Sequence, residues 1–127
     1  MSLLLDTHAL IWFTEGSNRL STMAKTQIEG RWESNFVSIV SLWEIVIKTS
    51  KTKLEIKKSF VEINQFLLIN NIHILDVKID HLNTLLILPH HHGDPFDRLI
   101  ISQAISENLT IISADQHFKA YPVSVLW

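Results

Sequence analysis

The chain alternates short apolar runs with longer segments of helical periodicity, and this alternation limits its fold more than any other feature. The apolar runs have the length of buried strands and lie at residues 2–6, 35–38, 73–77, 110–113 and 122–127. The helix-like segments lie at residues 9–13, 21–29, 40–49, 59–70, 78–88 and 95–108. Strands separated by helices pair in parallel through right-handed crossovers. We therefore predict an α/β fold, a three-layer α/β/α sandwich around a central, mainly parallel sheet of about five strands.

The composition fits one compact domain over residues 1–127. The chain is 46% hydrophobic and shows no repeat, low-complexity tract or Pro/Gly-rich linker. The lack of cysteine excludes disulfides and thiolate metal sites and is typical of a reducing compartment. Asp6 interrupts the N-terminal leucines, and no apolar run approaches the roughly 18 residues that a membrane span needs. We expect a cytoplasmic protein that is not inserted in a membrane.

The charge balance limits how the chain could bind nucleic acid. A formal net charge of −2 argues against binding by bulk positive charge, for which a pI above about 9 is usual. A phosphate ligand would have to meet a local positive field instead. Five lysines lie in one run, at residues 48, 51, 53, 57 and 58. The simpler explanation of this run is a solvated connection that follows a helix C-terminus.

Four acidic residues lie near the predicted ends of strands. Asp6 ends the first apolar run, and Asp115 follows the fourth run after one intervening residue. Glu44 lies in the first turns of the helix after the second run, and Asp97 lies in the first turn of the helix at 95–108. Ligands of parallel sheets gather beyond the carboxyl ends of the strands. We therefore expect these four carboxylates to converge on one edge of the sheet.

Asp97 is the most informative of the four acids. At 100° per residue it shares a helical face with apolar residues, so it points inward near the helix start. An unpaired carboxylate there is costly and needs hydrogen bonds, a cation or a raised pKa. Asp94 is expected to cap the same helix, with Pro95 at its first position. This cap does not explain the inward face of Asp97, which favours a site.

The other three acids have simple structural explanations when each is taken alone. Glu44 fits an i,i+4 pair with Lys48. Asp6 fits a cap of the following helix, and Asp115 fits a cap of the turn that begins at Gln116. The coincidence of all four acids at one edge is what favours a shared site.

Such a site needs positive charge. Two carboxylates about 4 Å apart repel by around 4 kcal/mol at an effective dielectric near 20. Mg²⁺ or Mn²⁺ would neutralise them, because these hard cations prefer oxygen ligands. The histidines at 90–92 are expected in a solvated loop, since adjacent residues diverge in direction and Gly93 follows. His8 and His117 are either structural or hydrogen-bonding partners of the acids.

The sequence closely resembles PIN-domain nucleases, and among them the VapC-like toxins of toxin–antitoxin pairs. The matching blocks, in the order of the family, are LLLDTHALIWF, VSIVSLWEIVIK, HHGDPFDRLIISQA, IISADQHF and the C-terminal PVSVLW. They cover nearly the whole chain. A single acid at a strand end is a weak signal, whereas four ordered blocks before the C-terminal run, with DPFDRLI close to a family-specific string, are a strong one.

The resemblance implies a nuclease that cuts RNA with one or two Mg²⁺ or Mn²⁺ ions. The metal-binding, catalytic quartet transfers to Asp6, Glu44, Asp97 and Asp115. Asp94, Thr7 and Ser113 match supporting positions of the family. Lys48, one turn beyond Glu44, and Arg98, beside Asp97, are hypothetical contacts to the substrate backbone.

The resemblance also implies a protein partner, a VapB-like antitoxin that lays an amphipathic segment near the acids. Trp12, Phe13 and Trp43 could frame its groove, although such aromatic residues are more often core. A mean hydropathy of +0.18 and four tryptophans suggest more apolar surface than one domain can cover. We expect a homodimer.

Two other classes remain open at this point. A metal-dependent phosphatase of the haloacid dehalogenase type also places an aspartate after its first strand, but it has a second aspartate two residues later, where this chain has His8. A non-enzymatic phospho-receiver module usually needs adjacent acids, which are absent around Asp6.

Overall fold

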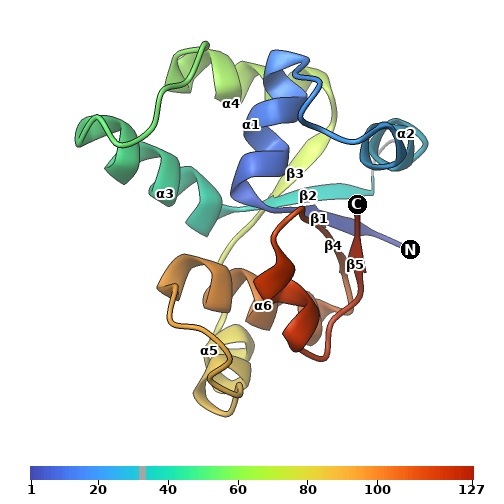
Figure 1. The fold of residues 1–127 in the computed structure, drawn as a ribbon, viewed down its shortest axis with the longest axis vertical. Helices are drawn as coiled ribbons and strands as arrows, with labels where there is room; N and C mark the ends of the chain where they lie inside the picture. The colour runs from blue at the N-terminus through green and yellow to red at the C-terminus, as the bar shows by residue number, and fades with distance from the viewer. Residues whose placement is uncertain (32–33) are drawn as a thin grey trace.

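A computed structural model describes residues 1–31 and 34–127 and places a five-stranded sheet between layers of helices (Figure 1). The strand order is β3-β2-β1-β4-β5, and all four neighbouring pairs are parallel. The strands are β1 (Leu3–Leu5), β2 (Asn35–Ser38), β3 (Ile72–Leu75), β4 (Thr110–Ile112) and β5 (Val125–Leu126). The helices are α1 (Thr7–Glu15), α2 (Thr22–Glu29), α3 (Ile39–Ser50), α4 (Phe60–Ile69), α5 (Ile79–Leu86), α6 (Pro95–Glu107) and the 3₁₀ helix η1 (Gln116–Ala120). The predicted α/β/α sandwich is confirmed.

The central strand β1 separates two hydrophobic cores. Leu3 and Leu5 belong to the core shared with α1, α2 and α4, whereas Leu4 belongs to the core shared with α6. Figure 1 shows these helices on opposite sides of the sheet. Alternate residues of a strand face opposite sides, so a run of three leucines suits a strand that is covered on both faces.

Three helices begin at the edge of the sheet where the strands end. Asp6 caps α1 by accepting from the N–H of Ala9, and Ser38 caps α3 by accepting from the N–H of Val40. Asp94 caps α6 through the N–H of Asp97. Helices α1 and α3 directly follow β1 and β2, so their starts stay next to the edge that carries the predicted site, whereas α6 follows α5 and reaches the same edge through the segment 87–94.

Several element boundaries differ from the predictions by one or more residues. Helix α1 begins two residues before the predicted residue 9, because Asp6 already supplies the cap. Strand β3 ends at Leu75 instead of residue 77. Strand β5 has two residues instead of the predicted 122–127, because Pro122 has no N–H and Val123 donates its own to the carbonyl of Tyr121 at 2.8 Å.

The helices are short compared with a bilayer. In residues 1–31 and 34–127, none combines the length and the apolar character that a membrane crossing requires.

Candidate active site

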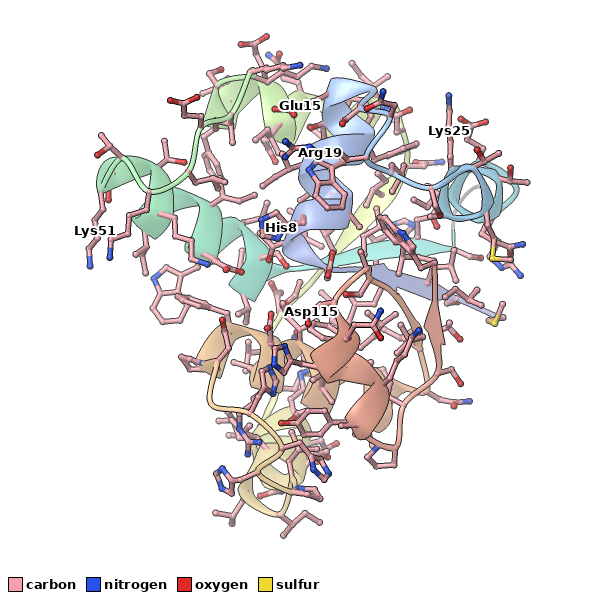
Figure 2. The ribbon with its side chains drawn as sticks, in the orientation of Figure 1. His8, Glu15, Arg19, Lys25, Lys51 and Asp115 are labelled. Atoms are coloured by element: carbon pink, nitrogen blue, oxygen red, sulfur yellow. The ribbon has the colours of Figure 1, made fainter. Side chains whose placement is uncertain are left out.

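The four predicted acids line one pocket at the carboxyl edge of the sheet. The pocket has a volume of about 320 Å³ and lies between the starts of α1 and α6, the helix α3 and the segment after β4. Figure 2 labels His8 and Asp115, which lie near the middle of the view where these elements meet. The lining residues are Asp6, Thr7, His8, Trp12, Glu44, Lys48, Asp94, Asp97, Ala114 and Asp115. The structure thus brings together acids from four separate parts of the chain.

Asp6 and Asp115 are linked through the hydroxyl of Ser113. Asp6 is 7% exposed, and burial raises its pKa against the hydrogen bonds from Ser113 and from the N–H of Ala9. The Ser113 hydroxyl also accepts from the N–H of Asp115 at 3.0 Å. Asp115 caps η1 by accepting from the N–H of His117 at 2.9 Å. The caps considered from sequence are therefore present, and both capping acids still face the pocket.

Glu44 is held by a hydroxyl on one side and an ammonium on the other. It is 3% exposed, and the Thr7 hydroxyl donates to its Oε1 at 2.6 Å. The hydroxyl of Ser41 lies 3.0 Å from that of Thr7. Lys48 forms an ion pair with Oε2 of Glu44. Burial lowers the pKa of Lys48, but the hydrogen bond and charge of Glu44 and the charges of the other acids outweigh this and raise it.

Asp97 shows that the acids act as one electrostatic cluster. Its pKa is raised to about 8, first by burial and then by the charges of Asp94, Glu44, Asp115 and Asp6. The side chain is 19% exposed, so solvent screens these charges only in part. A carboxyl with such a pKa is largely protonated at neutral pH, unless a cation replaces the proton.

The carboxylates of the pocket are suitable ligands for a hard divalent cation, although they are not arranged around a common ion position. In the described residues, no three His, Asp or Glu side chains are already placed to bind one metal ion together. Asp6, Asp94 and Asp115 each use Oδ1 to accept a backbone N–H, and Lys48 is paired with Glu44. Carboxylate ligands and an excess of negative charge nevertheless match Mg²⁺ or Mn²⁺. The predicted quartet, with Asp94 beside it, would supply the oxygen ligands for such an ion.

Arg98, predicted as a substrate contact, lies away from the pocket. It is 6% exposed, and its Nη1 donates to the carbonyl of Pro89 at 2.8 Å and to the hydroxyl of Tyr121 at 3.1 Å. Its Nη2 donates to the carbonyl of Leu88 at 3.2 Å. Consecutive residues on a helix point about 100° apart, so Arg98 does not follow Asp97 into the pocket. The predicted role of Arg98 is corrected to that of a structural donor.

Replacing Arg98 with leucine is expected to lower the free energy of unfolding by about 2 to 4 kcal/mol, because three acceptors lose this donor and two of them, on Tyr121 and Leu88, are buried. Urea unfolding monitored by tryptophan fluorescence measures the change. The exposed Arg19 provides the control, and Arg19→Leu is expected to stay within about 0.5 kcal/mol of the unmodified chain. Equal stabilities of the two variants would contradict the structural assignment.

His92 differs from the solvated loop that was predicted for residues 90–92. His90 and His91 are exposed, but the side chain of His92 is only 10% exposed. Its Nε2 lies 3.3 Å from Oδ2 of Asp97, and its ring stacks on that of His117 with centroids 5.0 Å apart. Burial lowers the pKa of His92. This role of His92 could not be predicted from the sequence, because no local spacing signals a contact that depends on how the loop folds back.

The other two histidines of interest lie beside the acids. His8 lines the pocket and packs against Trp12, with ring centroids 5.5 Å apart. His117 approaches Oδ1 of Asp115 with its Nδ1 at 2.9 Å. The structure places both where they can contact or screen a carboxylate.

Comparisons with known proteins agree on the fold. The family model described as PIN domain matches residues 3–123. No curated protein matches the sequence. A solved structure of VapBC2 from Rickettsia felis, bound to a DNA fragment from their promoter, matches with a TM-score of 0.75 and 21% identity over 99% of this chain and 98% of that chain.

Two further solved structures are similar over nearly their whole length. DNA-bound VapBC from Salmonella typhimurium gives a TM-score of 0.70 and 16% identity over 99% of this chain and 97% of that one. A toxin–antitoxin complex from Klebsiella pneumoniae gives a TM-score of 0.68 and 20% identity over 99% of this chain and 97% of that one. At these identities the likenesses show a shared fold.

Proposed function

The chain belongs to the PIN domain family, and from this premise we propose that it is a cytoplasmic, VapC-like toxin. It is a Mg²⁺- or Mn²⁺-dependent endoribonuclease that hydrolyses RNA phosphodiester bonds and is inhibited by a cognate antitoxin. The observation that carries the proposal is the convergence of four acids on one pocket, where burial and their mutual repulsion raise the pKa of Asp97 to about 8. A cluster that holds a proton so tightly is suited to exchange it for a cation.

The residues of the chain divide the work as ligands and supports. Asp6, Glu44, Asp97 and Asp115 hold the cation, while the hydroxyls of Thr7 and Ser113 orient Glu44 and Asp6. A bound divalent ion supplies polarisation of the phosphoryl oxygens and lowers the pKa of a water. In the proposed hydrolysis, water in place of the ribose 2′-hydroxyl attacks phosphorus and the bond to the 3′-oxygen breaks, which leaves a 5′-phosphate and a 3′-hydroxyl.

The test is RNA cleavage by the purified chain with Mg²⁺, Mn²⁺ or chelator. We expect cleavage with either ion, none with chelator, and 5′-phosphate ends on the products. Single-stranded DNA of the same sequence, a small phosphoester and a phosphodonor are incubated in parallel. Hydrolysis of the phosphoester alone would indicate the phosphatase, and phosphorylation of Asp6 would indicate the receiver module. Either outcome would overturn the nuclease proposal.

Lys48 is proposed to contact the RNA backbone. A cation bound by Glu44 would take the place of the Lys48 ammonium and leave this side chain free for a phosphate. Lys48→Ala is expected to slow cleavage and to reduce by about 1 the slope of log rate against log salt concentration, as loss of one phosphate contact should. Lys51 is exposed at the end of α3, far from the pocket (Figure 2), so Lys51→Ala is the control. An unchanged rate and salt slope in Lys48→Ala would remove this assignment.

A VapB-like antitoxin is the proposed protein partner. Two of the solved structures with this fold are described as VapBC and one as a toxin–antitoxin complex. Trp12 lines the acidic pocket, and Trp43 is 57% exposed and packs on Phe96, so both could contact a partner there. Phe13 instead packs edge-on against Phe66. Co-expression with the antitoxin should suppress cleavage, and full activity of a purified complex would count against it.

A homodimer is proposed for the free chain. The observation that supports it is the exposed apolar surface of α5, where Ile79 is 72% and Leu86 is 82% exposed. Sedimentation at micromolar concentration tests the assembly state, and a monomer at all concentrations would contradict it.

A further inference from the structure

The hydroxyl of Tyr121 is the centre of a buried hydrogen-bond network behind the acidic pocket. Tyr121 is 4% exposed, and its hydroxyl oxygen accepts from Nη1 of Arg98 at 3.1 Å and from the backbone N–H of His92 at 3.2 Å. The ring Nδ1 of His92 lies only 2.7 Å from the same oxygen. Three nitrogen atoms thus surround one hydroxyl group.

This crowding decides where the protons are. A tyrosine hydroxyl has one proton and two lone pairs. Arginine and a backbone amide can only donate, so together they occupy both lone pairs of Tyr121. The hydroxyl proton must then go to an acceptor, and Nδ1 of His92 at 2.7 Å is far better placed than the carbonyl of His92 at 3.5 Å. A protonated Nδ1 would find no lone pair to bind.

The tautomer of His92 follows. If Nδ1 accepts the Tyr121 proton, the neutral ring carries its own proton on Nε2. That nitrogen lies 3.3 Å from Oδ2 of Asp97. His92 therefore presents a donor to the carboxyl whose backbone N–H is already fixed by Asp94 at 3.0 Å.

We propose that His92, held in its Nε2–H tautomer by Tyr121, is the positioning residue of Asp97 and orients this carboxylate for the cation. The inference rests on the proposed function for the identity of the ligand, a hard divalent cation. Its physical content is that a ligand carboxylate binds best when a neighbouring donor restricts its rotation. Tyr121 and Arg98 thereby connect the pocket to the loop at Leu88 and Pro89.

His117, which stacks on His92, allows the tautomers of two neighbouring histidines to be compared. The rings of His92 and His117 lie 10° from parallel with centroids 5.0 Å apart. His117 faces Oδ1 of Asp115 with Nδ1, at 2.9 Å, and a carboxylate can only accept. His117 should therefore carry its proton on Nδ1. The two stacked imidazoles are expected to be opposite tautomers, each donating to a different acid of the pocket.

A purely structural role for His92 makes different predictions. If the ring only fills space under the loop, either tautomer would serve, and an isosteric apolar side chain would keep the pocket intact. If His92 positions Asp97, the side chain at position 92 must carry an N–H where Nε2 of His92 now faces Oδ2 of Asp97. His92→Gln retains an amide N–H that can reach this place, whereas His92→Leu does not.

The first test is long-range ¹H–¹⁵N correlation NMR of the metal-free, ¹⁵N-labelled chain near pH 7.5. We expect the Nε2–H pattern for His92, the Nδ1–H pattern for His117, and a loss of the single pattern of His92 in Tyr121→Phe. A charged ring or an Nδ1–H ring for His92 in the unmodified chain would overturn the proposal. This readout needs neither cleavage nor a metal.

The second test is Mn²⁺ binding, measured by the electron paramagnetic resonance signal of free Mn²⁺. His92→Leu is expected to weaken binding by about 10- to 100-fold, whereas His92→Gln should stay near the unmodified chain. His90→Leu, in the exposed part of the same loop, is the matched control. Unchanged Mn²⁺ affinity in His92→Leu, or an equal loss in His92→Gln, would contradict the positioning role.

The outcomes separate this inference from the proposed function. If the unmodified chain binds Mn²⁺ and fails to cut RNA, the proposed function fails, and the binding series still tests His92. If the chain cuts RNA with Mn²⁺ and His92→Leu binds and cuts normally, only the inference fails. Circular dichroism confirms that each variant is folded before binding is compared.

Discussion

Asp97→Asn is expected to slow metal-dependent RNA cleavage by roughly a thousandfold, which corresponds to about 4 kcal/mol of lost transition-state stabilisation. The substitution removes one negative charge from the pocket but keeps the size of the side chain. Asp97 is central to the cluster, because burial and the charges of four other acids raise its pKa to about 8. Without it, the remaining acids hold a cation less tightly, and one ligand to the ion is lost. Single-turnover cleavage of a labelled RNA at saturating Mn²⁺ measures the effect.

Asp80→Asn is the matched control for this experiment. Asp80 is also an aspartate in the first turn of a helix, but it is exposed on α5. Its replacement should leave cleavage unchanged. If Asp97→Asn cleaved as fast as Asp80→Asn under the same conditions, the acidic pocket would not be the active site.

The metal-free chain is expected to lose stability as the pH rises from about 4 to about 8. In the unfolded chain Asp97 titrates near 3.9, whereas in the folded chain its pKa is about 8. Between these values the native state binds more protons than the unfolded state, so the free energy of unfolding falls with rising pH. Asp6, whose pKa burial also raises, acts in the same direction. After allowance for screening, we expect a loss of roughly 2 to 4 kcal/mol.

Urea unfolding in chelator at several pH values measures this loss, and Asp97→Asn is the reference. The lowered pKa of His92 works in the opposite direction, because the unfolded ring takes up a proton that the folded ring does not. Subtracting the profile of Asp97→Asn cancels such shared contributions. The variant should be the more stable chain near pH 8. If the difference in unfolding free energy between the two chains did not change with pH, Asp97 would not have the raised pKa that the surrounding acids are expected to cause.

Mn²⁺ should reverse the loss at pH 8, since it replaces the protons that the acids have released. An ion at 100 times its dissociation constant stabilises the native state by about 2.7 kcal/mol. This gain should be smaller in Asp97→Asn and absent with chelator. Stabilisation of equal size in both chains would mean that the ion binds elsewhere.

Much of the fold could be predicted from local patterns. Runs such as Leu3–Leu5 predict strands buried on both faces, and the spacing between runs predicts parallel crossovers. The caps were also accessible, because Asp6, Asp94 and Asp115 bond the next turns through their own side chains, although the start of α1 was predicted two residues too late. Strand β5 was predicted too long. The N–H of Val123 bonds the carbonyl of Tyr121 in a turn and is not free to pair with β4, and an apolar pattern does not show this.

Less of the site could be predicted. Because ligands of parallel sheets bind beyond the carboxyl ends of the strands, four acids were predicted to lie in one region, and all four line one pocket. Arg98 was misplaced because sequence adjacency to Asp97 says little about direction on a helix. His92 was missed because its contact to Tyr121 spans 29 positions and depends on how η1 returns beneath the loop.

The sequence by itself determined which segments are strands and helices, where the helices are capped, and which acids stand at strand ends. Those properties depend on neighbours within a few residues, so periodicity and spacing report them. Only the tertiary structure decided that Thr7 donates to Glu44 across 37 positions and that Asp97 has a pKa of about 8. Burial and the distances between distant side chains control these properties, and both exist only once the sheet has brought its strand ends together.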